Sequence, residues 1–209
     1  MKIFHVFLLS VVANASCLGA SVLIPISYQA SEQLADGPNY YPDNGSLLTD
    51  GKEGLPFAAE EPVGGWGWVG WWSPDYASNF ISPSIAFDFG SSVSITKVSI
   101  NVLRWDEAAV YLPKQVKIQN QLFSVASETL LNQSSGWLDF YGSWDTSILN
   151  VSVEDVWKRG FNPGNPPPAG AWSFIGEVIT SGVPEPSSLS LLALGGLVLA
   201  LANKRKNYK

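Results

Sequence analysis

The stretch SIAFDFGSSVSITKVSINVLRW, residues 84–105, decides the fold of this chain. In residues 84–90, large apolar side chains alternate with small or charged ones, the period of two that is typical of a half-buried strand. After a Ser-Ser turn, residues 95–105 repeat the pattern, with Val98, Ile100 and Val102 on one face. The stretch therefore predicts two strands, each with one face toward a core.

Three further segments predict strands: KQVKIQ at 114–119, SILNVSV at 147–153 and AWSFIGEVIT at 171–180. Loops rich in Gly, Pro and Asn join the strands, the longest at 161–170. No long segment between the two ends of the chain shows helical amphipathicity. We therefore expect an all-β body at residues 21–182, most economically a β-sandwich.

Residues 1–20 have the layout of a secretory signal peptide: Lys2, then an apolar stretch, then small residues that allow cleavage after Ala15 or Ala20. An N-terminal membrane anchor is the alternative, and the short apolar run disfavours it. Cleavage removes His5, the one histidine, and can remove Cys17, the one cysteine. A mature chain of this kind has no imidazole for acid-base or zinc chemistry and no internal disulfide.

The body is acidic. Residues 21–182 hold 7 Lys and Arg against 17 Asp and Glu, a balance of 7 − 17 = −10. Such a surface repels phosphate backbones, so nucleic acid is excluded as an expected partner. Cations and neutral polymers remain open.

The C-terminus has three parts in a fixed order. Val183-Pro184-Glu185-Pro186 comes first, then a predicted helix at about 187–202 whose apolar run begins at Leu189, and the tail 203–209 carries Lys204, Arg205 and Lys206. The prolines mark a helix boundary, and the basic residues favour a cytoplasmic end for a membrane-spanning helix. We therefore expect a body outside the inner membrane and a short C-terminal transmembrane helix.

This arrangement closely resembles the PEP-CTERM sorting signal of Gram-negative bacteria over about the last 27 residues. The resemblance implies recognition by an exosortase and a transient anchor in the inner membrane. It also implies a final place in the cell envelope or the exopolysaccharide-containing extracellular matrix. One departure is that lysine dominates the basic cluster, where the family more often has arginine. An ordinary C-terminal anchor is the alternative.

The order of motifs in the body resembles discoidin-type, galactose-binding-like jelly rolls. LLTDG at 47–51 is followed by a Trp-rich loop ending GWVGWW, the two strands of 84–105, LPKQVKI and finally WSFIGEV. The resemblance covers about residues 27–181 and implies a jelly-roll β-sandwich. In such domains, an Asp in the first motif and a Glu on the last strand bind a structural Ca²⁺, and the matching residues are Asp50 and Glu177.

Glu53, which lies in the same loop as Asp50, is a third candidate oxygen ligand for calcium. Glu177 alternates in register with Ile175 and Ile179, so on a buried face its charge needs a partner or a metal. A salt bridge to Lys or Arg, or simple exposure, are the alternatives. Calcium is the one cofactor that the sequence suggests.

Tryptophans are the candidate ligand-binding residues, because exposed indole faces stack on the C–H faces of sugars. The candidates are Trp66, Trp68, Trp71, Trp72 and Trp105. Asp106 and Glu107 stand beside Trp105 as possible hydroxyl acceptors. The alternative is that these tryptophans plug the bottom of a sandwich.

The sequence thus predicts a non-catalytic, exported binding module with carbohydrate or exopolysaccharide as ligand. A structural matrix protein without a small ligand is the competing interpretation. A glycoside hydrolase is a weaker third, because it needs two carboxylates placed across a cleft and no spacing selects a pair.

Overall fold

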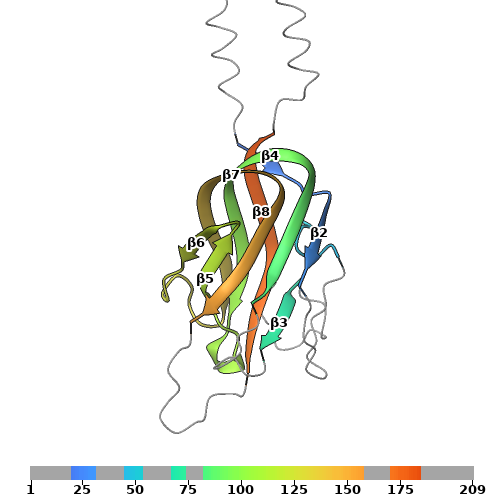
Figure 1. The fold of residues 1–209 in the computed structure, drawn as a ribbon. Helices are drawn as coiled ribbons and strands as arrows, with labels where there is room; N and C mark the ends of the chain where they lie inside the picture. The colour runs from blue at the N-terminus through green and yellow to red at the C-terminus, as the bar shows by residue number, and fades with distance from the viewer. Residues whose placement is uncertain (1–19, 32–44, 54–66, 74–81, 158–169, 185–209) are drawn as a thin grey trace, which may run out of the picture.

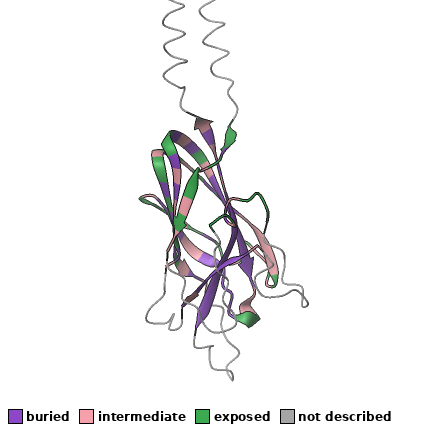
Figure 2. Ribbon diagram, turned by 90° about the vertical axis from the view of Figure 1, so that its right-hand side faces the viewer, coloured by how far each residue is buried: buried purple, intermediate pink, exposed green. Residues whose placement is uncertain are grey.

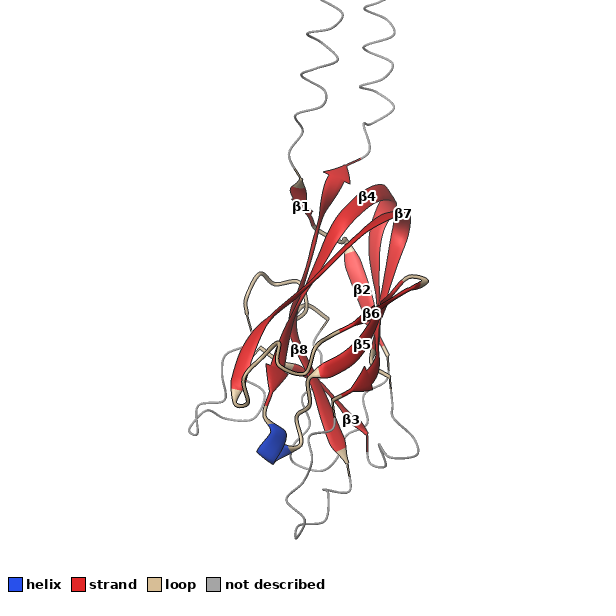
Figure 3. Ribbon diagram, turned by 90° about the vertical axis from the view of Figure 1, so that its left-hand side faces the viewer, coloured by secondary structure: helices blue, strands red, loops and turns tan. Residues whose placement is uncertain are grey.

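The computed structural model describes residues 20–31, 45–53, 67–73, 82–157 and 170–184. The predicted signal peptide, apart from Ala20, and the predicted transmembrane helix lie outside these residues. Eight strands and a short 3-10 helix make up the described part (Figures 1 and 3). They are β1 Ser21–Leu23, β2 Ser27–Ala30, β3 Val69–Ser73, β4 Ser84–Arg104, η2 Asp106–Ala108, β5 Pro113–Ile118, β6 Gln121–Ser124, β7 Ser134–Val156 and β8 Ala171–Pro184.

The strands form one antiparallel sheet that folds over into two layers. The order is β1-β8-β4-β7-β5-β6, with β2 also paired to β4 and β3 also paired to β8. The long strands β4 and β7 stay paired while they arch from one layer to the other (Figure 1). One layer holds β2, β5, β6, the first part of β4 (residues 84–88) and the last part of β7 (residues 148–156). The other layer holds β1, β3, β8, the second part of β4 (residues 93–104) and the first part of β7 (residues 134–146). The predicted all-β sandwich is confirmed.

The predicted Ser-Ser turn is wrong, because residues 84–104 form a single strand and not two strands joined by a turn. The pairing of β4 with β7 shifts register between Asp88 and Val93, and Gly90 there has a φ of 71°. Such irregularities bend a strand without ending it, and glycine adopts a positive φ at little cost. The same residues that suggest a turn therefore make the corner at which β4 changes layer.

Two apolar clusters hold the layers. The main core receives the inward faces of both layers, including Phe87 from one and Ile100 from the other. Figure 2 shows buried segments along the strands of both layers. A second cluster lies on the opposite face of β8 and is mainly aromatic. Its buried members are Trp68, Leu103, Val110, Trp172 and Phe174, with Trp72 and Trp105 packed against them.

Several strands differ from the prediction, and β1, β2 and β6 were not predicted at all. β3 replaces the end of the expected Trp-rich loop, and β7 begins at Ser134, thirteen residues before the predicted 147–153 segment. In residues 137–144, Trp, Leu, Phe and Tyr occur on both faces, so the alternation is blurred. In this stretch the inward-facing side chains belong to the main core, and the outward-facing Trp137 and Tyr141 do not.

The last strand joins the two ends of the sandwich. β8 has 14 residues, and at about 3.3 Å per residue it spans roughly 43 Å. Its first residues pair with β3, and its last residues pair with β1, where Ser21 lies opposite Gly182. β8 thus continues through Val183 to Pro184, which are also the first residues of the predicted sorting motif. Within the described ranges, no helix is long and apolar enough to cross a membrane.

Candidate functional site

The predicted tryptophans are mostly packing residues. Trp71 lies in the main core with 1% of its surface exposed, and Trp68 lies in the second cluster with 3% exposed. Neither indole face is available to a ligand, so these two tryptophans pack in the interior of the sandwich, which was the alternative interpretation. Trp72 and Trp105 are half-buried, and Trp72 packs on Trp172 with ring centroids 5.0 Å apart. Trp66 lies outside the described residues.

The segment after β4 is tied down by a residue that the sequence did not single out. Arg104 is 2% exposed and donates from Nε and Nη2 to the two carboxylate oxygens of Asp106, both at 3.1 Å. Its Nη1 donates to the carbonyls of Ser127 and Leu130. Asp106 therefore balances a buried guanidinium and is not the free hydroxyl acceptor that we expected.

The structure brings Asp50 and Glu177 together, as the sequence predicted. Leu48 accepts a hydrogen bond from the Val178 N–H (2.9 Å), which holds the loop of residues 45–53 against the edge of β8 between β1 and β3. Glu177 is 3% exposed. Burial, and after it the adjacent Asp50 charge, outweigh the N–H donors of Gly51 and Lys52 and raise the pKa of its carboxyl to about 7.

These two carboxyls fit a hard cation in part. Glu177 Oε2 has no hydrogen-bond partner among the described residues, and no Lys or Arg there pairs with this carboxyl. Carboxylate oxygens beside loop carbonyls are the ligands that Ca²⁺ takes. The third candidate, Glu53, is instead held by the indole N–H of Trp137 at 3.0 Å. The described residues contain no group of three or more His, Cys, Asp or Glu side chains around one point.

A different aromatic surface lies on β7. Trp137, Asp139 and Tyr141 alternate with the buried Leu138 and Phe140, so the first three share the outward face. Trp137 is half-exposed and Tyr141 is 66% exposed. Beside them is a cavity of about 410 Å³. Its lining also includes Phe123, Val125 and Thr129. We call this the β7 groove.

The polar group at the centre of the β7 groove is fixed and ionised. Asp139 accepts from Ser99 Oγ at 2.7 Å on one oxygen and from Lys97 Nζ at 2.9 Å on the other. Partial burial raises the pKa of Asp139, but the hydrogen bonds from Lys97 and Ser99 and the Lys97 charge outweigh it and hold the pKa below its usual range. The hydrogen bond to Asp139 raises the pKa of Lys97 in turn.

The β7 groove combines an aromatic platform with one acceptor of set orientation. The hydrogen bond to Glu53 orients the Trp137 ring, and the Lys97 ammonium lies 5.6 Å from the centre of the Tyr141 ring. Each Asp139 oxygen has one partner and keeps a lone pair for a ligand hydroxyl. The pattern W-x-D-x-Y at 137–141 was the sequence signal for this site. It was hidden because the strand was not recognised.

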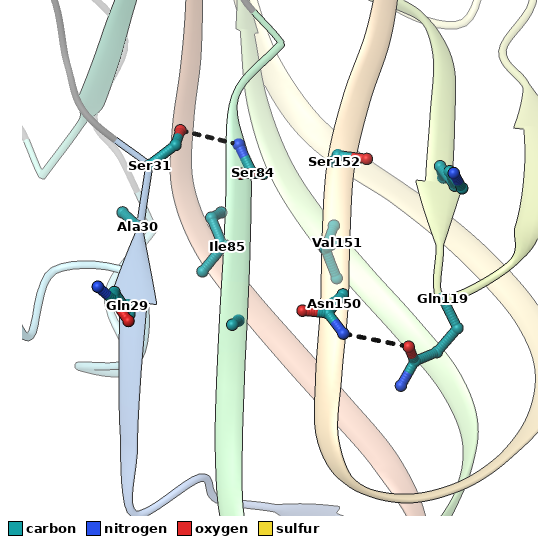
Figure 4. A pocket seen from close by; sticks show the side chains of 11 residues that line it. Gln29, Ala30, Ser31, Ser84, Ile85, Gln119, Asn150, Val151 and Ser152 are labelled. Atoms are coloured by element: carbon teal, nitrogen blue, oxygen red, sulfur yellow. Dashed lines mark hydrogen bonds between the residues drawn. The ribbon is translucent and has the colours of Figure 1, made fainter.

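A second depression crosses the other layer. It has a volume of about 350 Å³ and lies on the outer faces of β2, β4 and β7 and at the end of β5 (Figure 4). Amide and hydroxyl side chains line it together with Lys117 and small or aliphatic residues, and Asn150 Nδ2 donates to Gln119 Oε1 at 3.3 Å. No aromatic side chain lines it. It can hydrogen-bond a polar molecule but offers no ring to stack on.

An all-β sandwich whose last strand continues directly into a C-terminal Pro-Glu-Pro segment is the class of protein that these features define. Residues 182–206 match the family model of the PEP-CTERM protein-sorting motif, which confirms the predicted sorting signal. This motif implies export, exosortase processing and transient membrane anchoring in Gram-negative bacteria. No curated protein matches the chain.

Several solved structures are similar to the chain at low identity. CpGH89CBM32-5 from Clostridium perfringens, in complex with GalNAc-beta-1,3-galactose, is 14% identical with a TM-score of 0.41, over 78% of this chain and 100% of that one. The CBM32-1 and CBM32-2 domains of Clostridium perfringens ZmpB, in complex with GalNAc, are 12% identical with a TM-score of 0.44, over 81% and 38%. A chitosan-binding module from Paenibacillus sp. IK-5 is 14% identical with a TM-score of 0.39, over 77% and 97%. The sugars named are ligands of those proteins.

Proposed function

We propose that this protein is an exported, exosortase-sorted module that binds carbohydrate in the cell envelope or extracellular matrix. The observation that carries the proposal is the β7 groove, in which Trp137 and Tyr141 flank the oriented carboxylate of Asp139. Aromatic faces stack on sugar rings at little entropic cost, and an ionised carboxylate accepts from ring hydroxyls. A cavity of about 410 Å³ is within the range of small-ligand sites.

The geometry favours neutral glycans. Lys97 already neutralises the charge of Asp139, and the body as a whole is acidic. Anionic polysaccharides would therefore be repelled at long range. Trp72 and Trp105, half-buried at the β3 end of the sandwich, are secondary candidates for stacking in this proposal.

The test is a polysaccharide pull-down and glycan array with the exported chain and two variants of one residue. Tyr141→Ala removes the exposed ring and should lower affinity by about 1–3 kcal/mol, the scale of a lost aromatic contact at a binding site. Tyr141→Phe keeps the ring and should retain most of the binding. Equal binding by all three chains would contradict the β7 groove as the site. Absence of binding to neutral and acidic polysaccharides alike would favour the structural matrix protein.

A structural Ca²⁺ belongs to the same proposal, with Asp50 and Glu177 as ligands and Glu53 left on Trp137. The ion would supply positive charge to two adjacent carboxyls and tie the first loop to the last strand. Binding to the native state alone raises stability by about 2.7 kcal/mol at 100 times the dissociation constant. Thermal unfolding with calcium and with a chelator should therefore differ, and Asp50→Ala should abolish the difference. Overlapping wild-type curves would leave both residues as ordinary carboxyls.

The division of the chain into a signal peptide at 1–20, a body at 21–182 and a sorting region at 183–209 is also part of this proposal. The pairing of Ser21 with Gly182 supports it, since the body is closed by strands at its two limits. The overlap of β8 with Val183 and Pro184 means that body and sorting region adjoin without a linker.

A further inference from the structure

Three apolar side chains are exposed in a row at the end of the sandwich where the chain enters and leaves. Val22, Ile24 and Ile26 are 62%, 75% and 72% exposed, while Leu23 between them is buried in the main core. The three lie within five residues of the chain, from β1 to the bend that precedes β2. We call them the N-terminal apolar row. Isolated exposed apolar residues are ordinary, but three within five positions concentrate apolar surface at this end of the sandwich.

The row is held in place by the backbone. Ser21–Leu23 pairs with Thr180–Gly182 of β8, and Thr180 Oγ1 donates to the Leu23 carbonyl at 2.6 Å. The Ile26 N–H donates to the Asp88 carbonyl at 2.7 Å, beside the corner of β4. The row is therefore a fixed feature of this end of the fold.

The position of the sorting motif identifies what covers the row. β8 ends at Pro184, and the apolar run of the matched motif begins at Leu189, five residues further on. Five residues span at most about 17 Å when fully extended. Because Val22 lies opposite Ser181 in the sheet, an anchored chain keeps the row near the headgroup layer. This step rests on the membrane anchoring that the proposed function includes.

We infer that the N-terminal apolar row contacts the lipid bilayer and seats the sandwich on the membrane while the tail is anchored. Asp88 and Asp145 lie at the same end, because Asp145 accepts from Ser94 Oγ and Ser94 pairs with Val183. Their charges oppose anionic lipid, so apolar burial drives the contact, and zwitterionic lipid suffices. The β3 end of the sandwich then points away from the bilayer.

The experiment uses the full chain in phosphatidylcholine vesicles, with Cys17→Ser so that one introduced cysteine carries a fluorophore. Ile24→Cys tests the row. Leu131→Cys is the matched control, because Leu131 is an apolar residue that is 80% exposed and lies between β6 and β7. Lipids that carry a nitroxide near the headgroup quench only fluorophores at the bilayer surface. We expect several-fold stronger quenching at position 24 than at position 131. Co-sedimentation with the vesicles measures anchoring separately.

Each outcome decides the inference. If quenching is equally weak at both positions in a chain that co-sediments, the N-terminal apolar row does not contact the bilayer, although the chain is anchored. A label at position 24 that is shielded from water but not quenched by lipid would identify a protein cover, such as a second copy, and would also overturn it. Ile24→Ser with Ile26→Ser should release the body from the surface without loss of co-sedimentation. A chain that fails to co-sediment would refute the anchoring itself, while glycan binding by the β7 groove is measured independently.

Discussion

The two ends of β8 are stabilised in different ways. At the β3 end, the aromatic side chains of Trp172 and Phe174 stack with ring centroids 5.3 Å apart, and residues 171–178 are all buried. At the β1 end, the strand carries Gly182, and a Cβ there would lie 2.0 Å from the Ser94 carbonyl oxygen. One end depends on side-chain packing and the other on close approach of two backbones. The same strand is thus sensitive to loss of volume at one end and to gain of volume at the other.

The largest expected loss of stability is at the β3 end of β8, where side-chain packing stabilises the strand. Trp71→Ala removes an indole with 1% exposure from the main core and should lower the free energy of unfolding by about 3–5 kcal/mol. The neighbouring Trp72→Ala, at a half-buried position, should cost clearly less. Chemical denaturation of both variants measures the difference. Equal losses would show that the second cluster contributes as much as the main core.

The free energy of unfolding should depend on pH through Glu177, which lies in the middle of β8. Because the folded pKa of Glu177 is about 7 and the ordinary value is 4.5, the folded chain binds this proton more tightly than the unfolded chain. Its contribution to stability is full below pH 4.5, is lost as the pH rises through about 7, and amounts to about 3 kcal/mol. Denaturation in a chelator should show this slope, and Glu177→Gln should remove it. A flat wild-type profile would mean that another charge balances the carboxylate.

At the close-approach end, Gly182→Ala should force β4 and β8 apart. Overpacking of this kind costs about 1–3 kcal/mol. The control is Ser181→Ala, which adds no atom and should change stability by less than about 0.5 kcal/mol. If the two variants unfold at the same denaturant concentration, the backbones at this end have room to separate.

The smallest effect on stability is expected in the β7 groove. Tyr141→Ala removes a ring that is 66% exposed and should change the free energy of unfolding by less than about 0.5 kcal/mol. Its loss of glycan binding would then belong to the site and not to the fold. A large destabilisation would instead place Tyr141 among the packing residues and remove its claim to a binding role.

The main strands could be predicted because the alternation of apolar and polar residues is a local property of the sequence. The alternation around Phe87 and Ile100 gave the strands, and the order of motifs brought Asp50 and Glu177 together correctly. The alternation could not show whether Ser91-Ser92 ends a strand or bends it, because both readings have the same period. Long-range pairing decides between them, and the β4 to β7 register is set by residues 30 to 68 positions apart.

The binding surface was harder to predict because tryptophan serves both burial and recognition. GWVGWW drew attention to a cluster that turned out to hold the sandwich together, while Trp137 stood in a segment whose strand was missed. Its hydrogen bond to Glu53 joins positions 84 residues apart, and nothing in either local sequence indicates it. Exposure, which separates the two uses of an indole, is a property of the folded chain.

The place of β8 in the sheet also sets the order in which the protein can fold. β8 is the last strand made, yet it lies between β4 on one side and β1 and β3 on the other, and Ser21 reaches Gly182 across 161 positions. Contacts of such long range slow folding, and a sheet that lacks an interior strand leaves the edges of its neighbours unpaired. The sandwich therefore cannot close until the chain is available up to Pro184. In the export that we propose, the sorting region follows this strand directly, so closure of the sandwich and arrival of the sorting signal are successive steps of one event.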